Sequence, residues 1–197
     1  MPETSDADFS WREFVRRNND ELVATYGNLV QRVLTFTYRN FDHCVPSPGA
    51  LDAESNALLE KAKVTLETVD RLLHGCHFRE SVREAMALAQ EANRYLDNKA
   101  PWKRLNENRD SAASSVFTVI GVISCLKTVL YPFLPFSSER LHSLLGFEDR
   151  LQDRGWTFIL PQAGQRLPPP EHLFAKLDDK TVEKESALLK QSSKYPS

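Results

Sequence analysis

Apolar residues near the N-terminus recur at the spacing of an amphipathic helix. Ser10 and Glu13 form a capping box, and Phe9 and Phe14 occupy the positions of a hydrophobic staple. Apolar residues then return every three or four positions as far as Phe36, before a loop at 44–52 that contains two prolines and a glycine. This pattern predicts one long helix, followed by a break in the chain.

Two further helical patterns follow the loop. The first runs from about Asp52 to His74, with Gly75 as a suitable residue to end it, and the second runs from near Phe78 to about Asn98. The second carries small alanines on its apolar face, which favours a close helical neighbour. The apolar residues that we expect to be buried in the first are Val64, Leu66, Val69, Leu72 and Leu73.

Residues 114–133 are apolar on nearly every side, which predicts the central helix of a bundle, ended by Pro132 and Pro135. A short amphipathic helix at 136–147 closes at Gly146. Residues 161–172 contain four prolines and predict an irregular crossing segment, and 179–191 predict a last short helix. Only 156–160 could form a strand. We therefore expect an all-α bundle of about five helices over 1–179, with an irregular C-terminal segment and a tail at 180–197.

Composition places the chain among ordinary globular proteins. It has 197 residues, of which 41% are hydrophobic and 26% charged, enough for one domain with a real core. No run of eighteen apolar residues suggests a membrane span, and the N-terminus does not resemble a signal peptide. Three cysteines without short spacing indicate free thiols in a reducing compartment. We expect a cytoplasmic monomer that contacts no membrane.

The sequence contains no recognisable catalytic centre. Neither a phosphate-binding GxxxxGK[ST] loop nor a GxGxxG turn is present. The two histidines of "HGCH" (His74 to His77) lie across a glycine turn and lack the further ligands that a metal site needs, so a structural role is favoured. We predict no catalytic residue, no metal ligand and no cofactor in this chain.

Charge and aromatic placement leave one question open. The net charge of −2 argues mildly against a nucleic-acid partner, but residues 93–109 hold five cationic and two acidic side chains. Within "NRYLDNKAPWK", Trp102 follows Pro101 and precedes two basic residues. The residues alone favour a partly buried Trp102 that seals a helix end, because large aromatics are mostly buried. The alternative is an exposed platform for a flat, anionic ligand.

Two stretches carry a resemblance to a known family. "WREFVRRNNDELVATYGNLVQRVLTF" and "SVREAMALAQEANRYLDNKAPWK" resemble the C-terminal anticodon-binding domain of bacterial-type methionyl-tRNA synthetases, and "YPFLPFSSERLHSLLG" and "LFAKLDD" are similar to its later segments. The resemblance covers roughly residues 3–179. The HIGH-type and KMSKS-type motifs of the family's catalytic half are absent, so the chain looks like a domain that begins where that half would end.

The resemblance implies a set of RNA-binding residues. By analogy with the family, Asn28 and Arg32 read the first anticodon base, and Trp102 after Pro101 stacks on it. Residues four apart share a helical face, so Asn28 and Arg32 can converge on one base. An indole is a good stacking surface for a base that has left its stack. Arg39, Asn40, Lys103 and Arg104 are candidates for contacts with nearby phosphates.

The expected partners follow from the same resemblance. They are methionine tRNA, through its CAU anticodon loop, and the catalytic domain of the parent methionine–tRNA ligase, which would bind ATP with magnesium. Two alternatives remain at this point. One is the similar bundle of cysteinyl, leucyl, isoleucyl or valyl synthetases, and the other is a helical protein-interaction module without an RNA role.

Overall fold

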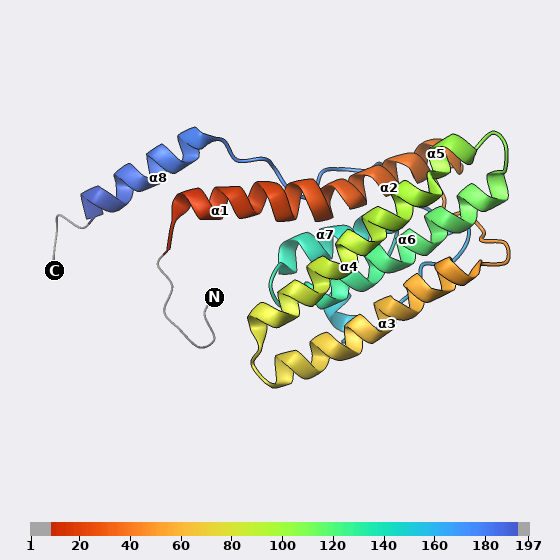
Figure 1. The fold of residues 1–197 in the computed structure, drawn as a ribbon, viewed down its shortest axis with the longest axis horizontal. Coiled ribbons are helices and arrows are strands. Elements are labelled where there is room, and N and C mark those ends of the chain that lie inside the picture. The colour runs from red at the N-terminus through yellow and green to blue at the C-terminus, as the bar shows by residue number, and fades with distance from the viewer. Residues whose placement is uncertain (1–8, 193–197) are drawn as a thin grey trace.

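The computed structural model describes residues 9–192, and its first three helical segments form one continuous rod (Figure 1). They are α1 (Trp11–Arg17), the π-helix η1 (Asn18–Gly27) and α2 (Asn28–Asn40). The Ser10 side chain accepts a hydrogen bond from the backbone N–H of Glu13, and the rings of Phe9 and Phe14 lie 6.4 Å apart. The predicted helix and its cap are confirmed, whereas ten residues of π-helix in its middle were not foreseen.

The helix α4 (Phe78–Lys99) packs against η1 and α2 of this rod, and α3 (Ala53–His74) forms a hairpin with α4 (Figure 1). Asp52 caps α3 by accepting the N–H of Ser55 at 2.8 Å. We expected Val64 to be buried in α3, and this prediction is wrong because Val64 is 46% exposed. The buried positions of α3 follow heptad-like spacing and include two hydroxyl residues that a search for apolar letters passes over: Ser55, Leu58, Ala62, Thr65 and Val69.

The helix α3 ends at His74 with Gly75 as its C-cap, as predicted, but the left-handed residue of the turn is Cys76. Gly75 has an ordinary negative φ of −84°, and Cys76 takes the left-handed conformation with φ 58°. A Cβ on Gly75 would lie 2.7 Å from the ring of His77, so the His77 ring would have to shift to admit a larger residue. The "HGCH" stretch is therefore occupied in making a tight helical turn.

The central helix α6 (Arg109–Val129) packs against both α3 and α4 and is buried on all sides from Val116 to Val129. It is long and apolar enough to cross a membrane by length and composition, so the expectation that no segment has this character was wrong. However, 94% of its most apolar window is buried inside the bundle. A core helix shows the same properties, because it must offer apolar surface to neighbours on every side.

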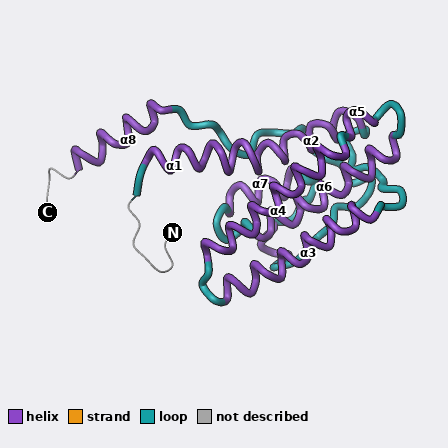
Figure 2. The backbone as a smooth tube through the Cα atoms, in the orientation of Figure 1, coloured by secondary structure: helices purple, strands orange, loops and turns teal. Residues whose placement is uncertain are grey.

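Shorter elements complete the described part of the chain. They are α5 (Pro101–Arg104), α7 (Pro135–Leu144), the 3-10 turn η2 (Leu151–Arg154) and α8 (Asp179–Ser192), which extends beside α1 (Figure 2). Residues 156–160 are not a strand, and among residues 9–192 only an isolated bridge joins Cys44 to Arg166. Gly146 follows the end of α7 and has a φ of +81°, and a Cβ at this position would collide with the carbonyl of Arg166. The all-α prediction is confirmed; residues 193–197 of the expected tail lie outside the described residues.

Lys127 and His142 are fully buried in this fold. Lys127 Nζ donates to the carbonyl of Ser124 at 3.2 Å and lies 5.3 Å from the centre of the Phe147 ring. The His142 ring stacks on Phe147 at 4.5 Å, and its Nε2 lies 3.3 Å from Asp149. Burial lowers the pKa of Lys127 to about 8, and burial also lowers the pKa of His142 below its ordinary value. The core thus contains a cation whose charge costs stability.

Replacing this lysine should make the protein more stable at neutral pH. Between about 8 and 10.5 the unfolded chain keeps a proton that the folded chain has released at Lys127, so the lysine's contribution to the free energy of unfolding rises with pH. We expect Lys127→Met to raise the free energy of unfolding by about 1–3 kcal/mol at neutral pH, with a smaller gain near the upper end of that window.

Urea unfolding of the parent and the variant, once at neutral pH and once near pH 10.5, measures this difference. The comparison between the two proteins is needed because burial raises the pKa of Cys125 to about 12, which lowers stability above the ordinary thiol pKa in both. A gain that stays constant with pH would show that Lys127 keeps its charge throughout.

Candidate nucleic-acid interface

Trp102 sits at a sharp elbow between α4 and α5. Ala100 takes the left-handed conformation, with φ 40° and ψ 58°, directly before Pro101. Because the residue before a proline is disfavoured in the right-handed helical region, α4 ends here, and α5 begins with the proline at its first position. A left-handed alanine costs roughly 1 kcal/mol, so packing must hold it. The turn that aims Trp102 therefore depends on Ala100 as well as on Pro101.

Exposure separates the two residues of this elbow. Pro101 is buried, so it shapes the turn and does not offer a surface for RNA, contrary to its place among the expected RNA-binding residues. Trp102 is 40% exposed, so it is partly covered at a helix end, as the residues alone favoured, and still presents part of its surface to solvent. Its indole is held at the surface by the buried proline beside it.

The structure brings Arg32 and Trp102 together. The guanidinium carbon of Arg32 lies 4.8 Å from the centre of the indole, in cation–π contact. The same guanidinium donates from Nη2 to Oδ1 of Asp97 at 2.8 Å. Asn28 lies one helical turn before Arg32 on α2 and is exposed. Two helices that are far apart in the sequence, α2 and α5, thus place an aromatic face, a guanidinium and a neighbouring amide at one surface. The sequence alone had not pointed to Asp97 as a partner of Arg32.

Lys99 has a structural role here. Its Nζ lies 2.7 Å from Asp52 and 2.6 Å from Glu54, and its side chain is only 13% exposed. The Lys99 ammonium, together with the Ser55 hydroxyl and N–H, holds the pKa of Asp52 well below its usual range. Lys99 therefore ties the C-terminal end of α4 to the N-terminal end of α3.

The remaining expected phosphate-binding residues lie at the same end of the bundle, where α2 ends and α5 begins (Figure 1). Arg39, Lys103 and Arg104 are exposed. Asn40 is partly buried, and its Nδ2 donates to the carbonyl of Phe36 at 2.8 Å. Arg109 was not singled out beforehand; it donates to the Asn40 carbonyl at 2.6 Å and so joins the start of α6 to the end of α2.

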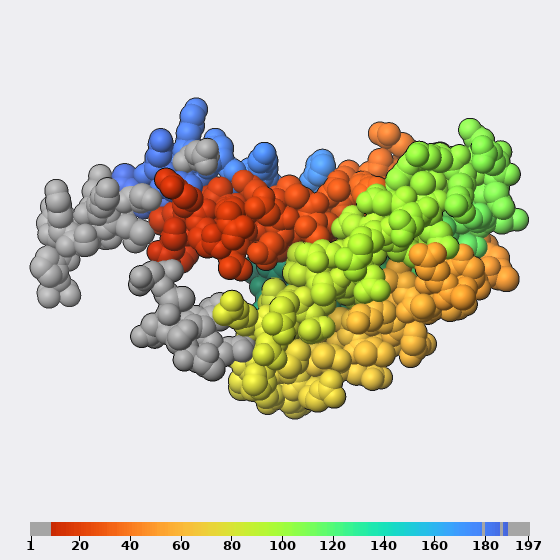
Figure 3. All heavy atoms as spheres, viewed as in Figure 1, coloured from red at the N-terminus to blue at the C-terminus, as the bar shows by residue number. Residues whose placement is uncertain are grey.

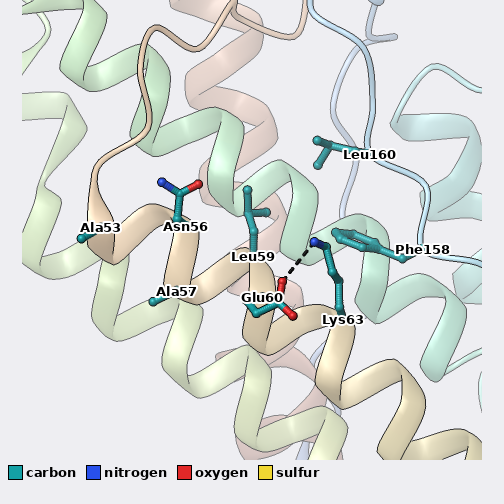
Figure 4. Close-up of a pocket in the computed structure, with 8 residues that line it drawn as sticks. All are labelled: Ala53, Asn56, Ala57, Leu59, Glu60, Lys63, Phe158 and Leu160. Carbon is teal, nitrogen blue, oxygen red and sulfur yellow. Dashed lines mark hydrogen bonds and ion pairs between the residues drawn. The ribbon is translucent and has the colours of Figure 1, made fainter.

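A separate cavity of about 540 Å³ lies between α3 and residues 158–160 (Figure 4). Its lining is mostly apolar, and its two charged groups, Glu60 and Lys63, pair with each other at 3.0 Å. Among the described residues, no cluster of three or more His, Cys, Asp or Glu could hold a metal ion. The chemistry around Trp102 therefore makes the stronger candidate site.

Comparison with known proteins gives the relatives of this chain. A family model described as the anticodon binding domain of methionyl tRNA ligase matches residues 45–191, and a model of class I (M) tRNA synthetases matches residues 1–34. The methionine–tRNA ligase of Dehalococcoides mccartyi is 57% identical over 189 residues, which are 96% of this chain and 34% of that protein. The chain thus spans about a third of the curated relatives it matches.

Solved structures agree with the fold. Methionyl-tRNA synthetase of Mycobacterium tuberculosis in its apo form aligns with a TM-score of 0.84 and 24% identity, covering 90% of this chain and 37% of that one. The same enzyme bound by methionyl-adenylate aligns with a TM-score of 0.79 and 25% identity, covering 85% of this chain and 34% of that one.

The Lys99 contacts can be tested by comparing two lysines on either side of the elbow. Lys99→Met leaves Asp52 and Glu54 facing each other without a cation, so we expect the free energy of unfolding to fall by about 1 kcal/mol. Lys103→Met, at an exposed position, serves as the matched control and should leave stability unchanged. Denaturant titration measures both. Equal stability of the two variants would contradict a structural role for Lys99.

Proposed function

Because the chain belongs to the family of methionyl-tRNA ligase anticodon-binding domains, we propose that it recognises the CAU anticodon of methionine tRNAs. The observation that carries this proposal is the exposed Trp102 indole with the Arg32 guanidinium 4.8 Å above it. Single-stranded RNA is recognised by splaying bases onto aromatic faces and hydrogen-bonding their edges. Family membership also removes the cysteinyl, leucyl, isoleucyl and valyl alternatives for this chain.

The two side chains on α2 complement the edge of cytosine. Cytosine presents a carbonyl oxygen and a ring nitrogen as acceptors and an amino group as a donor. Arg32 has five N–H donors, and Asp97 accepts from one terminal nitrogen only, so other donors remain for the two acceptors of the base. The amide oxygen of Asn28 can accept from the amino group. This division of roles accounts for selection of cytosine at the first anticodon position.

Phosphate contacts supply the rest of the affinity. Arg39, Lys103 and Arg104 are exposed around the base-binding residues and attract the backbone of the loop, and Asn40 lies beside Arg39. Pro101 acts indirectly, through the buried turn that orients Trp102. We assign base recognition to Asn28, Arg32 and Trp102.

The domain works as part of a longer chain. In this proposal residues 1–179 form the RNA-binding bundle, residues 180–197 form an appended tail, and a class I catalytic domain attaches methionine to the tRNA using ATP with magnesium. The match of residues 1–34 to the class I (M) model supports a junction with such a domain. The parent enzyme is a cytoplasmic methionine–tRNA ligase, and this domain alone is a monomer.

A helical protein-interaction module is the remaining alternative. Binding of a CAU hairpin that weakens steeply with salt distinguishes the two, because phosphate contacts release counterions. A chain that binds no RNA at low salt would favour the alternative.

Trp102→Ala should weaken binding of a CAU hairpin by roughly 1–3 kcal/mol, because stacking on the indole is lost. Trp102→Phe should keep part of the affinity, since a smaller ring remains. Because the side chain is 40% exposed, thermal melts of both variants should stay close to the parent. A melt far below the parent, as expected after deletion of a core aromatic, would contradict the stacking role.

Asn28→Ala and Arg32→Ala should each reduce discrimination for cytosine at the first anticodon position by roughly 1–3 kcal/mol, because the first removes the acceptor for the amino group and the second removes donors to the base edge. Titration of hairpins that carry each of the possible first bases measures this effect. Arg39→Ala is the matched control and should weaken all hairpins alike. Uniform losses from Asn28→Ala and Arg32→Ala would instead assign both residues to the backbone.

A further inference from the structure

One face of α4 carries an exposed row of residues that leads to the elbow. The row has helical spacing of four, three and four, so its members project in nearly the same direction. All of them are exposed, and none belongs to the packed core. They are Arg83, Ala87, Gln90 and Arg94, which we call the α4 track.

Contacts on either side of Arg94 fix the direction of the α4 track. Asn93 donates to the carbonyl of Thr25 in η1 at 3.2 Å, and the hydroxyl of Tyr95 lies 2.6 Å from the hydroxyl of Ser55 in α3. Successive side chains on a helix differ by about 100°. Arg94 therefore projects outward, between the neighbour on one side and the neighbour on the other.

The α4 track is continuous with the base-binding site. Three residues beyond Arg94, Asp97 shares the outward side of the helix and accepts the hydrogen bond from Arg32. In the space-filling view, α4 forms a ridge across the visible face and meets α2 near α5 (Figure 3). From Arg83 to Arg94 the rise along the helix is about 16 Å.

The charge of the track is available to a ligand. Within residues 9–192, neither Arg83 nor Arg94 makes an ion pair, whereas Arg16 and Arg17 on α1 are held by Glu13. The acidic residues Glu84 and Glu91 follow Arg83 and Gln90 by one position and so project toward α3, about a quarter turn away. Glu80 and Glu91 lie three residues before Arg83 and Arg94, so these carboxylates flank the α4 track on the side toward α3 without forming an ion pair with its arginines.

We propose that the α4 track binds the sugar-phosphate backbone of the anticodon stem while the loop is held at Trp102; this inference rests on the proposed function. Two guanidiniums about three helical turns apart suit a polyanion with regularly repeated charges. Gln90 lies between them and can donate to a phosphate or ribose hydroxyl. Ala87 adds no bulk, so a backbone can approach closely.

A paired stem fits this position better than the loop. A base stacked on Trp102 places the loop at the elbow, and Arg83 lies some 24 Å back along the helix axis from the end of α4 at Lys99. RNA that reaches Arg83 has left the loop by several nucleotides and is base-paired. Paired RNA is bound through its phosphates and ribose hydroxyls, and no base identity is needed at the track.

The test uses charge reversal at matched surface arginines. Arg83→Glu and Arg94→Glu should each weaken binding of a CAU hairpin with its full stem by about 3- to 10-fold and reduce the salt slope by about 1 or more. Discrimination among first anticodon bases should not change. Arg71→Glu, with the same charge change at an exposed position on α3, is the control and should bind like the parent.

An isolated loop oligonucleotide separates stem contacts from loop contacts. We expect the two track variants to bind this oligonucleotide as the parent does. If they bind the full hairpin as tightly as Arg71→Glu does, or lose the loop oligonucleotide equally, the track assignment is overturned. If the parent chain itself fails to prefer CAU over other anticodons, the proposed function fails instead, so the two failures are distinguishable.

Discussion

A helix that is apolar on every side must be enclosed, and α6 imposes this constraint on the whole domain. Its buried stretch from Val116 to Val129 has α3 and α4 packed against it, with α2, α5 and α7 around the remainder. Burial of this surface is the dominant favourable contribution to folding. Enclosing α6 also buries Lys127, and burying its charge lowers the free energy of unfolding. Once α6 is enclosed, the orientation of α4 and therefore the position of the elbow are set.

The candidate site lies at the rim of this core, where several local constraints meet. The C-terminal end of α4 is tied to α3 through Lys99, the chain reverses at the left-handed Ala100, and Pro101 is buried below the indole. Arg32 reaches across from α2 and holds both Asp97 and the face of Trp102. A side chain that is already ordered loses little entropy when a ligand binds, so this arrangement is consistent with the proposed stacking of a base on Trp102.

Charge distribution reconciles an acidic chain with an RNA partner. The net charge is −2, but many carboxylates form ion pairs with basic side chains of the same chain. Glu13 pairs with Arg16 and Arg17, and Asp149 pairs with Arg154. The guanidiniums of Arg83 and Arg94 on α4 make no ion pair within residues 9–192, although glutamates of the same helix lie within about a quarter turn of them. Because the chain belongs to the methionyl-tRNA ligase anticodon-binding family, we interpret this local pattern as a surface for RNA. Local potential, and not the overall sum, decides where a polyanion binds.

The sequence by itself determined the features that depend on neighbouring residues. The cap at Ser10, the bounds of α3 and α4, the buried nature of α6 and the glycine at 146 follow from spacing and backbone preference, which act over a few residues. The resemblance in turn selected Asn28, Arg32 and Trp102. Tertiary structure decided which polar residues meet. Arg32 and Asp97 are 65 positions apart, Lys99 and Asp52 are 47 apart, and the burial of Ser55 and Thr65 in place of Val64 reflects where α6 and α4 lie. Contacts between distant segments arise only when the core has packed, because hydrophobic periodicity specifies a face of each helix but not the neighbour that this face will meet.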